Sequence, residues 1–114
     1  MLTHKSAIVT GSTSGIGLGI ARAFAEQGAD VLLNGFGNAD EIEFTRAELQ
    51  RRYGVKVRYS GADMSRPEQV RAMAELARAE FGRVDIVVNN AGIQHVAPVE
   101  EFDEAKWDAV LAIN

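Results

Sequence analysis

The strongest constraint on the fold is a set of short apolar runs separated by segments of helical length. The runs are Ala7-Ile8-Val9, Val31-Leu32-Leu33 and Ile86-Val87-Val88. None alternates with polar residues, which is typical of strands that are buried on both faces in a parallel sheet. A fourth segment, 55–60, alternates strictly between apolar and polar residues, so we expect it at a sheet edge.

Between these runs, apolar residues repeat with a helical period. The three helical stripes begin at Ile16, Ile42 and Val70, and the glycines that follow them as stops are Gly28, Gly54 and Gly82. The segment Ser65-Arg66-Pro67-Glu68 fits a capping box for the third helix. A fourth helix is expected from Asp103 onward.

The resulting order is β-α-β-α-β-α-β-α, and right-handed crossovers of this kind build an open parallel sheet with helices on both faces. The prediction is a Rossmann-type, doubly wound α/β fold. Residues 1–114 would form its N-terminal, dinucleotide-binding half and stop within the helix after the fourth strand. No linker or repeat indicates a second domain.

Charge and composition exclude several classes of function. The chain has 12 basic and 16 acidic residues, and the acidic excess lies in residues 99–114, so the basic surface of a nucleic-acid-binding protein is absent. No apolar run approaches the ~20 residues of a membrane span, and the first residues lack a signal peptide, so a cytoplasmic location is expected. Without cysteine, thiolate metal sites and cysteine nucleophiles are excluded, and no metal site is predicted.

The first strand continues into Thr10-Gly11-Ser12-Thr13-Ser14-Gly15-Ile16-Gly17, at the start of the first helix. Gly11 permits a tight exit from the strand, Gly15 lets the backbone approach a pyrophosphate, and Gly17 allows close helix packing. The helix N-terminus adds unpaired N–H groups and a positive dipole end. The segment therefore predicts a dinucleotide site.

The fourth strand ends in Asn89-Asn90-Ala91-Gly92, beside the first strand, at the point where ligands bind in such sheets. Small residues there let a cofactor ring approach, and Asn90 can hydrogen-bond its ribose. Alternatively, the tetrapeptide is a polar turn held by its own asparagine side chains.

These two motifs resemble those of the short-chain dehydrogenase/reductase family. The cofactor-binding residues that the resemblance implies are Gly11, Thr13, Ser14, Gly15, Ile16, Gly17, Asn90 and Gly92. In the same way, Asp63 matches the acid that binds the adenine amino group. Asn114 matches an asparagine of the catalytic set that helps to hold the catalytic lysine through a water.

A narrower resemblance, to bacterial members that oxidise 3-hydroxybutyrate, covers Asn34-Gly35-Phe36-Gly37 and residues 92–100. It implies that Phe36 lines the adenosine site and that Gln94 contacts the carboxylate of a small hydroxy or keto acid. A lone loop histidine such as His95 is more often structural than catalytic. Two alternatives stay open: another reductase of the family, such as one for 3-oxoacyl carrier-protein thioesters, and a nonenzymatic dinucleotide sensor.

NAD is the expected cofactor, because neither 34–37 nor the glycine turn contains the Arg or Lys that a 2′-phosphate needs. The acidic residue that usually hydrogen-bonds the ribose diol is absent too. The resemblance also implies a homotetramer, and hydride transfer assisted by a serine, a tyrosine and a lysine. Tyr53 and Tyr59, the two tyrosines, lack the Tyr-x-x-x-Lys pattern, so we expect these 114 residues alone to be inactive.

Overall fold

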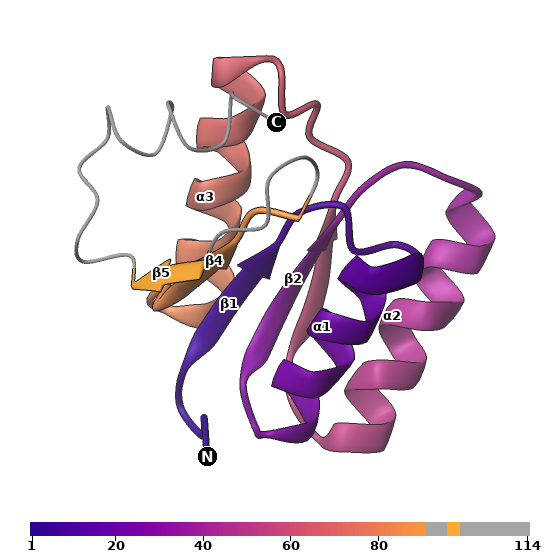
Figure 1. Cartoon of the computed structure of the whole chain (residues 1–114), viewed down its shortest axis with the longest axis vertical. Helices are drawn as coiled ribbons and strands as arrows, with labels where there is room; N and C mark the ends of the chain where they lie inside the picture. Colours follow the sequence, from indigo (N-terminus) through magenta and orange to yellow (C-terminus); the bar gives the residue numbers. More distant parts are fainter. Residues whose placement is uncertain (91–95, 99–114) are drawn as a thin grey trace.

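The computed structural model describes residues 1–90 and 96–98, and its sheet has the strand order β3-β2-β1-β4-β5 (Figure 1). The strands are β1 (Ser6–Val9), β2 (Asp30–Asn34), β3 (Val57–Ser60), β4 (Ile86–Val88) and β5 (Val96–Pro98). The helices are α1 (Gly15–Glu26), α2 (Ala39–Tyr53) and α3 (Pro67–Phe81). The first four strands are parallel and alternate with the helices, which confirms the Rossmann-type prediction.

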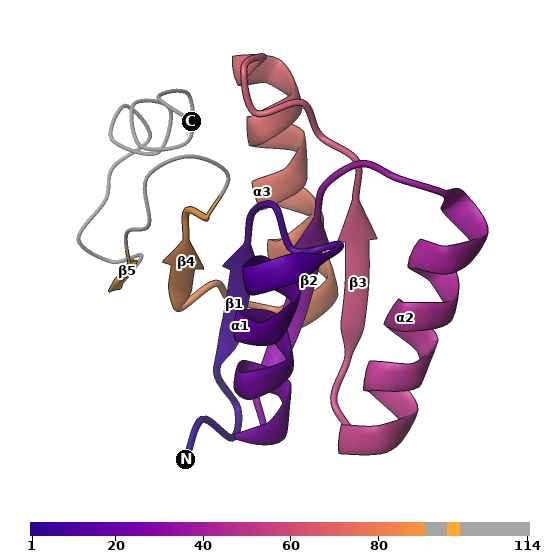
Figure 2. The same cartoon turned by 45° about the vertical axis from the view of Figure 1, so that its right-hand side comes forward.

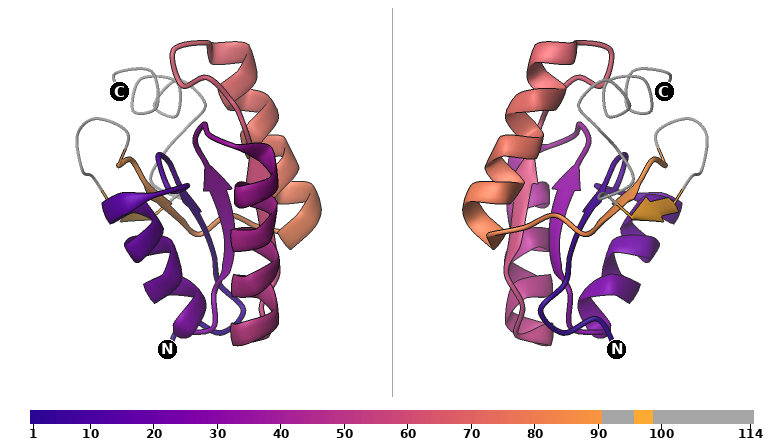
Figure 3. Two further views of the ribbon diagram at one scale, coloured as in Figure 1. Left: turned by 90° about the vertical axis from the view of Figure 1, so that its right-hand side faces the viewer. Right: turned by 90° about the vertical axis from the view of Figure 1, so that its left-hand side faces the viewer.

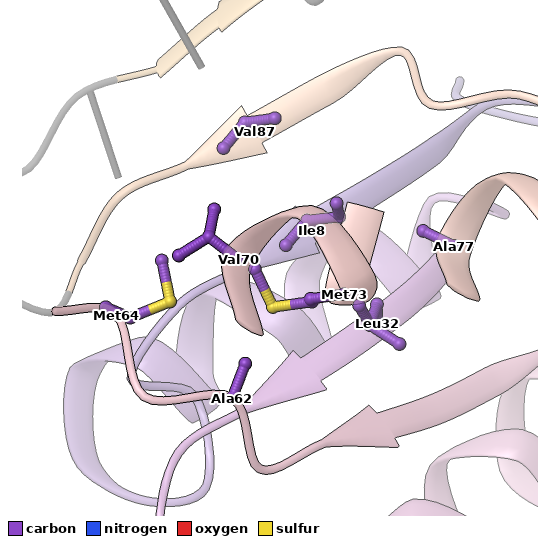
Figure 4. Close-up of a cluster of buried hydrophobic side chains, with 8 residues drawn as sticks. All are labelled: Ile8, Leu32, Ala62, Met64, Val70, Met73, Ala77 and Val87. Atoms are coloured by element: carbon purple, nitrogen blue, oxygen red, sulfur yellow. The ribbon is translucent and has the colours of Figure 1, made fainter. Parts of the chain in front are cut away.

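The helices cover both faces of the sheet, and α3 lies on the opposite side from α1 (Figure 3). Successive residues of β1 point to the two faces. Ile8 packs with Leu32 and Val87 against Val70 and Met73 of α3 (Figure 4). Val9 belongs to the other cluster, whose buried helical members are Ala21 and Ala25 of α1 and Leu49 of α2. Both faces of β1, β2 and β4 are therefore buried, as their continuous apolar runs predict.

The strand β5 was not expected from the sequence. It pairs antiparallel with β4, in a register that places Val88 opposite Val96. Three residues that end in a proline are too few to give a period-2 signal. The alternating segment at 55–60 does form an edge strand, although β3 begins only at Val57.

The capping-box prediction is wrong. The N-cap of α3 is Arg66, which makes no side-chain capping bond, and Pro67 occupies the first helical turn. The Ser65 hydroxyl instead donates to Oδ1 of Asp63 at 2.7 Å. The predicted helix ends are confirmed, because Gly54 and Gly82 are left-handed C-caps and Gly28 follows the cap of α1.

The fourth helix expected from Asp103 lies outside the described residues. Among residues 1–90 and 96–98, no helix combines the length and apolar character needed to cross a membrane.

Candidate functional site

Strands β1 to β4 all point to the same end of the sheet, so their carboxyl ends lie together there (Figure 2). The glycine turn, residues 10–17, is fixed at this end by Ser12. The Ser12 hydroxyl donates to the Val9 carbonyl at 2.6 Å, and the Ser12 amide donates to the Asn34 carbonyl at 2.6 Å. The turn is thus tied to the ends of both β1 and β2.

Two glycines of this turn have opposite surroundings. A Cβ on Gly17 would overlap the Gly11 carbonyl oxygen and lie 2.6 Å from Nδ2 of Asn90, so the start of α1 packs directly on the turn. Gly15 has a φ of +60°, and a Cβ there would meet no protein atom within 4 Å. The turn is therefore packed on the side of Gly17 and open on the side of Gly15, where a ligand has room.

The N-terminus of α1 is suited to an anion. Its N-cap, Ser14, makes no side-chain capping bond, and its first turn contains no acidic residue. In α2, by contrast, the Asn38 side chain accepts from the Glu41 amide, and Asp40 and Glu41 lie in the first turn. Uncapped N–H groups and an unopposed dipole end attract a pyrophosphate. The geometry of the glycine turn fits the dinucleotide that the sequence predicts.

Asn34 organises the site, although sequence reasoning did not assign it a role. Its side chain is buried, its Oδ1 accepts from the Gly11 amide at 3.4 Å, and its Nδ2 donates to the carbonyls of Ser60 and Ala62, both at 3.0 Å. It therefore joins the glycine turn to the end of β3. The available signal was an amide directly after the apolar run Val31-Leu32-Leu33.

Asn90 is held against the glycine turn. Its Nδ2 donates to the Gly11 carbonyl at 3.2 Å, and its backbone amide donates to Oγ1 of Thr10 at 2.9 Å. Oγ1 of Thr10 in turn donates to Oδ1 of Asn89 at 3.1 Å. The side chains of Asn89 and Asn90 thus bond to the glycine turn, 79 residues away in sequence, whereas the polar-turn alternative expects bonds within their own tetrapeptide. The ribose contact of Asn90 stays a prediction.

The predicted adenosine residues line one cleft. It has a volume of about 370 Å³, and its walls include Gly11, Thr13, Ser14, Phe36 and Asp63. Phe36 is 70% exposed, so a flat apolar face is available to a ligand ring. The Thr13 hydroxyl donates to the Phe36 carbonyl at 3.0 Å and ties the two walls together.

Asp63 is held as an ionised hydrogen-bond acceptor. The hydroxyl and the amide of Ser65 donate to its Oδ1, at 2.7 and 2.9 Å, and these bonds, with the nearby Arg66, lower the pKa of the carboxyl group. An ionised carboxylate at the rim of the cleft can accept a hydrogen bond from an exocyclic amine.

Other predicted site residues contribute less to the described geometry. Ile16 is 70% exposed in the first turn of α1. Gly92, Gln94, His95 and Asn114 lie outside the described residues. Within the described part of the chain, no group of three or more His, Asp or Glu side chains could hold a metal ion.

Comparison with known proteins agrees with this geometry. The sequence model of a family described as short chain dehydrogenase matches residues 5–114. D-beta-hydroxybutyrate dehydrogenase of Cupriavidus necator is 55% identical over 115 residues, which cover 100% of this chain and 43% of that protein. The enzyme of the same name from Rhizobium meliloti is 44% identical over 110 residues, or 96% of this chain and 43% of the relative.

A solved structure, L-sorbose reductase from Gluconobacter frateurii complexed with NADPH and L-sorbose, superposes with a TM-score of 0.74 at 36% identity. The match covers 97% of this chain and 45% of that one. The chain thus spans less than half the length of these relatives.

Proposed function

The chain belongs to the short-chain dehydrogenase family, and from that premise we propose that the protein containing it is an NAD-dependent oxidoreductase. Its reaction would interconvert (R)-3-hydroxybutyrate and acetoacetate. The observation that carries the proposal is the similarity of the entire chain to the Cupriavidus necator dehydrogenase. The cleft that joins Phe36 and Asp63 to the glycine turn supports the dinucleotide part of it.

The residues of this chain would bind and orient the two reactants. The N-terminus of α1 and the open side of Gly15 would receive the pyrophosphate, while Phe36 and Asp63 would receive the adenosine. When bound there, NAD would supply the acceptor for the hydride that leaves the carbinol carbon. Gln94 would hydrogen-bond the substrate carboxylate, and Asn114 would support the catalytic lysine contributed by the rest of the protein.

The preference for NAD rests on the charge of the described site. The L-sorbose reductase neighbour binds NADPH, so the family alone does not fix the cofactor. Among the described residues that line the cleft, no Lys or Arg is available to neutralise a 2′-phosphate.

An assay of the full-length protein tests the proposal. We expect NADH to form from NAD and (R)-3-hydroxybutyrate, and little to form from the (S)-enantiomer. Turnover of 3-oxoacyl thioesters with NADPH instead would indicate the alternative reductase. NADH binding without turnover of any hydroxy acid would indicate a dinucleotide sensor.

We further propose that the full-length protein is a cytoplasmic homo-oligomer, a tetramer as in the family it resembles. Its molar mass, measured by light scattering during size-exclusion chromatography, should be four times that of one chain. A monomeric mass would contradict this.

A further inference from the structure

Phe36 stands between two hollows that share part of the glycine turn. On one side is the cleft that ends at Asp63. On the other side a second hollow, of about 620 Å³, opens toward the first turn of α2. Thr13, Ser14 and Phe36 line both hollows. If the proposed function holds, a ribose that joins a pyrophosphate at Gly15 to an adenine near Asp63 lies over these three shared residues.

The usual place for reading the ribose carries no charge in this chain. In dinucleotide-binding folds, the group at the ribose 2′ position is recognised by a residue about 20 positions beyond the glycine turn. An acidic residue there hydrogen-bonds the 2′-hydroxyl of NAD, or a nearby Arg accommodates the 2′-phosphate of NADP. Here Asn34 is buried and its amide is bonded to the end of β3. A side chain on Gly35 would lie 2.6 Å from Oγ1 of Thr13. Neither position can present a carboxylate to the ribose.

Asp63 lies at the adenine end of the first cleft, and the charge that faces the second hollow comes from α2. Asp40 and Glu41 are exposed residues of its first turn, and they are the charged residues among those that line the second hollow. The helix N-terminus contributes only about half a positive charge, and Asn38 already accepts from one of its amides. Arg46 of the same helix is paired with Glu43 and donates to the Val57 carbonyl. The two carboxylates therefore make the net charge that faces the second hollow negative.

We propose that Asp40 and Glu41 set the cofactor preference of this protein by repelling the 2′-phosphate of NADP. In other NAD-binding folds, an acidic residue at the end of the second strand selects NAD, and here Asp40 and Glu41 would do so instead. The difference is that the free 2′-hydroxyl is favoured by charge exclusion from the neighbouring helix, without a direct hydrogen bond to a carboxylate at position 34 or 35.

The test is a binding measurement on the full-length protein without substrate. The dissociation constants of NADH and NADPH are measured by cofactor fluorescence, for the wild type and for Asp40→Asn/Glu41→Gln. A 2′-phosphate carries close to two negative charges, so we expect the NADPH constant to fall by about tenfold. The NADH constant should stay within about twofold, which also shows that the variant is folded.

The matched control is Glu43→Gln/Glu48→Gln. It removes the same charge from the same helix, but from carboxylates that pair with Arg46 and Arg22 and do not line the second hollow. The control should leave the ratio of the two constants unchanged. In addition, the ionic strength is raised from about 0.05 to 0.5 M. In the wild type this should lower the ratio of the NADPH to the NADH dissociation constant, because salt screens the repulsion, whereas the ratio in the Asp40/Glu41 variant should not fall.

An unchanged ratio in Asp40→Asn/Glu41→Gln would overturn the inference while leaving the proposed function standing. An equal shift in the control would also overturn it, because the effect would then be one of total helix charge. Failure of the wild type to bind NADH would overturn the proposed function itself, together with the inference that rests on it.

Discussion

Gly17 and Gly19 lie two residues apart in α1 and have different surroundings. A Cβ on Gly17 would overlap the Gly11 carbonyl, whereas one on Gly19 would meet no atom within 4 Å. We expect Gly17→Ala to lower the free energy of unfolding by about 1–3 kcal/mol, because backbone would have to move. Gly19→Ala should raise it by up to about 1 kcal/mol through helix propensity.

Urea unfolding of the full-length protein measures both changes. The same two variants should also differ in cofactor affinity. Gly17→Ala should weaken binding, since only that substitution displaces the turn. Equal stability of the two variants would show that the start of α1 does not pack on the glycine turn as described.

A second prediction concerns the hydrogen-bond donors of the Asn34 side chain. Its Nδ2 donates to two carbonyls, which a carboxylate cannot do. We therefore expect Asn34→Asp to destabilise the protein at neutral pH by about 1–3 kcal/mol and to weaken dinucleotide binding. Asn38→Asp is the control, because the Asn38 side chain only accepts, as an N-cap, and aspartate caps equally well. Similar unfolding midpoints for the two variants would contradict the role given to Asn34.

A third residue-level prediction concerns Asp63. Its pKa is lowered first by the bond from the Ser65 hydroxyl, then by the Ser65 amide and by Arg66. A depressed pKa means that the bonds stabilise the fold above the unfolded pKa of about 3.9 and that this contribution is lost as the pH falls through the folded pKa. NMR titration should place the Asp63 pKa below about 3.9. Ser65→Ala should raise it and Ser65→Thr should not.

At the scale of elements, the open edge of β3 is covered by side chains of α2. Oε1 of Gln50 accepts from the Val57 amide at 3.0 Å and from Arg58 at 2.8 Å, while Arg46 donates to the Val57 carbonyl at 2.9 Å. Gln50→Leu should cost about 1–3 kcal/mol in unfolding free energy, because a partly buried amide loses its acceptor. Gln50→Glu keeps an acceptor and should remain near the wild type. Equal losses in both variants would mean that this bond contributes nothing.

The elements also show which parts of the fold were predictable. The buried strands β1, β2 and β4 were visible because a strand covered on both faces must be apolar throughout. The strand β5 left no such signal, since pairing of three residues with β4 depends on tertiary contacts. The capping box failed because the Ser65 hydroxyl is engaged by Asp63, a competition that residue spacing does not reveal.

Features of the site that depend on backbone geometry were predictable from the sequence. Features that depend on side-chain hydrogen bonds were less so. The packed side of Gly17 and the shared cleft of Phe36 and Asp63 follow from the glycine pattern and the family resemblance. The role of Asn34 depends on which carbonyls of β3 lie near the end of β2, and only the folded sheet brings these together.

At the scale of the whole molecule, the described part of the chain contains the cleft of Phe36 and Asp63, and both tyrosines of the sequence make contacts of their own. The Tyr59 hydroxyl donates to the Gly35 carbonyl at 2.5 Å, beside the cleft that Gly35 and Phe36 line. Tyr53, in the last turn of α2, packs against the core cluster of Val9 and Leu49, with Arg52 over its ring. Neither belongs to a Tyr-x-x-x-Lys pair, so neither is expected to exchange a proton with the proposed substrate.

Residues 1–114 by themselves should therefore show no NAD-dependent oxidation of 3-hydroxybutyrate. General acid–base help is worth about 10²–10⁴-fold in rate, and the Tyr-x-x-x-Lys pair that would supply it is absent from this sequence. The assay follows NADH formation, with the full-length protein as the positive control and intact mass confirming the 12.3 kDa chain. Sustained, substrate-dependent NADH formation by that chain would mean that proton transfer uses another group, and the family mechanism could not then be carried over to this protein.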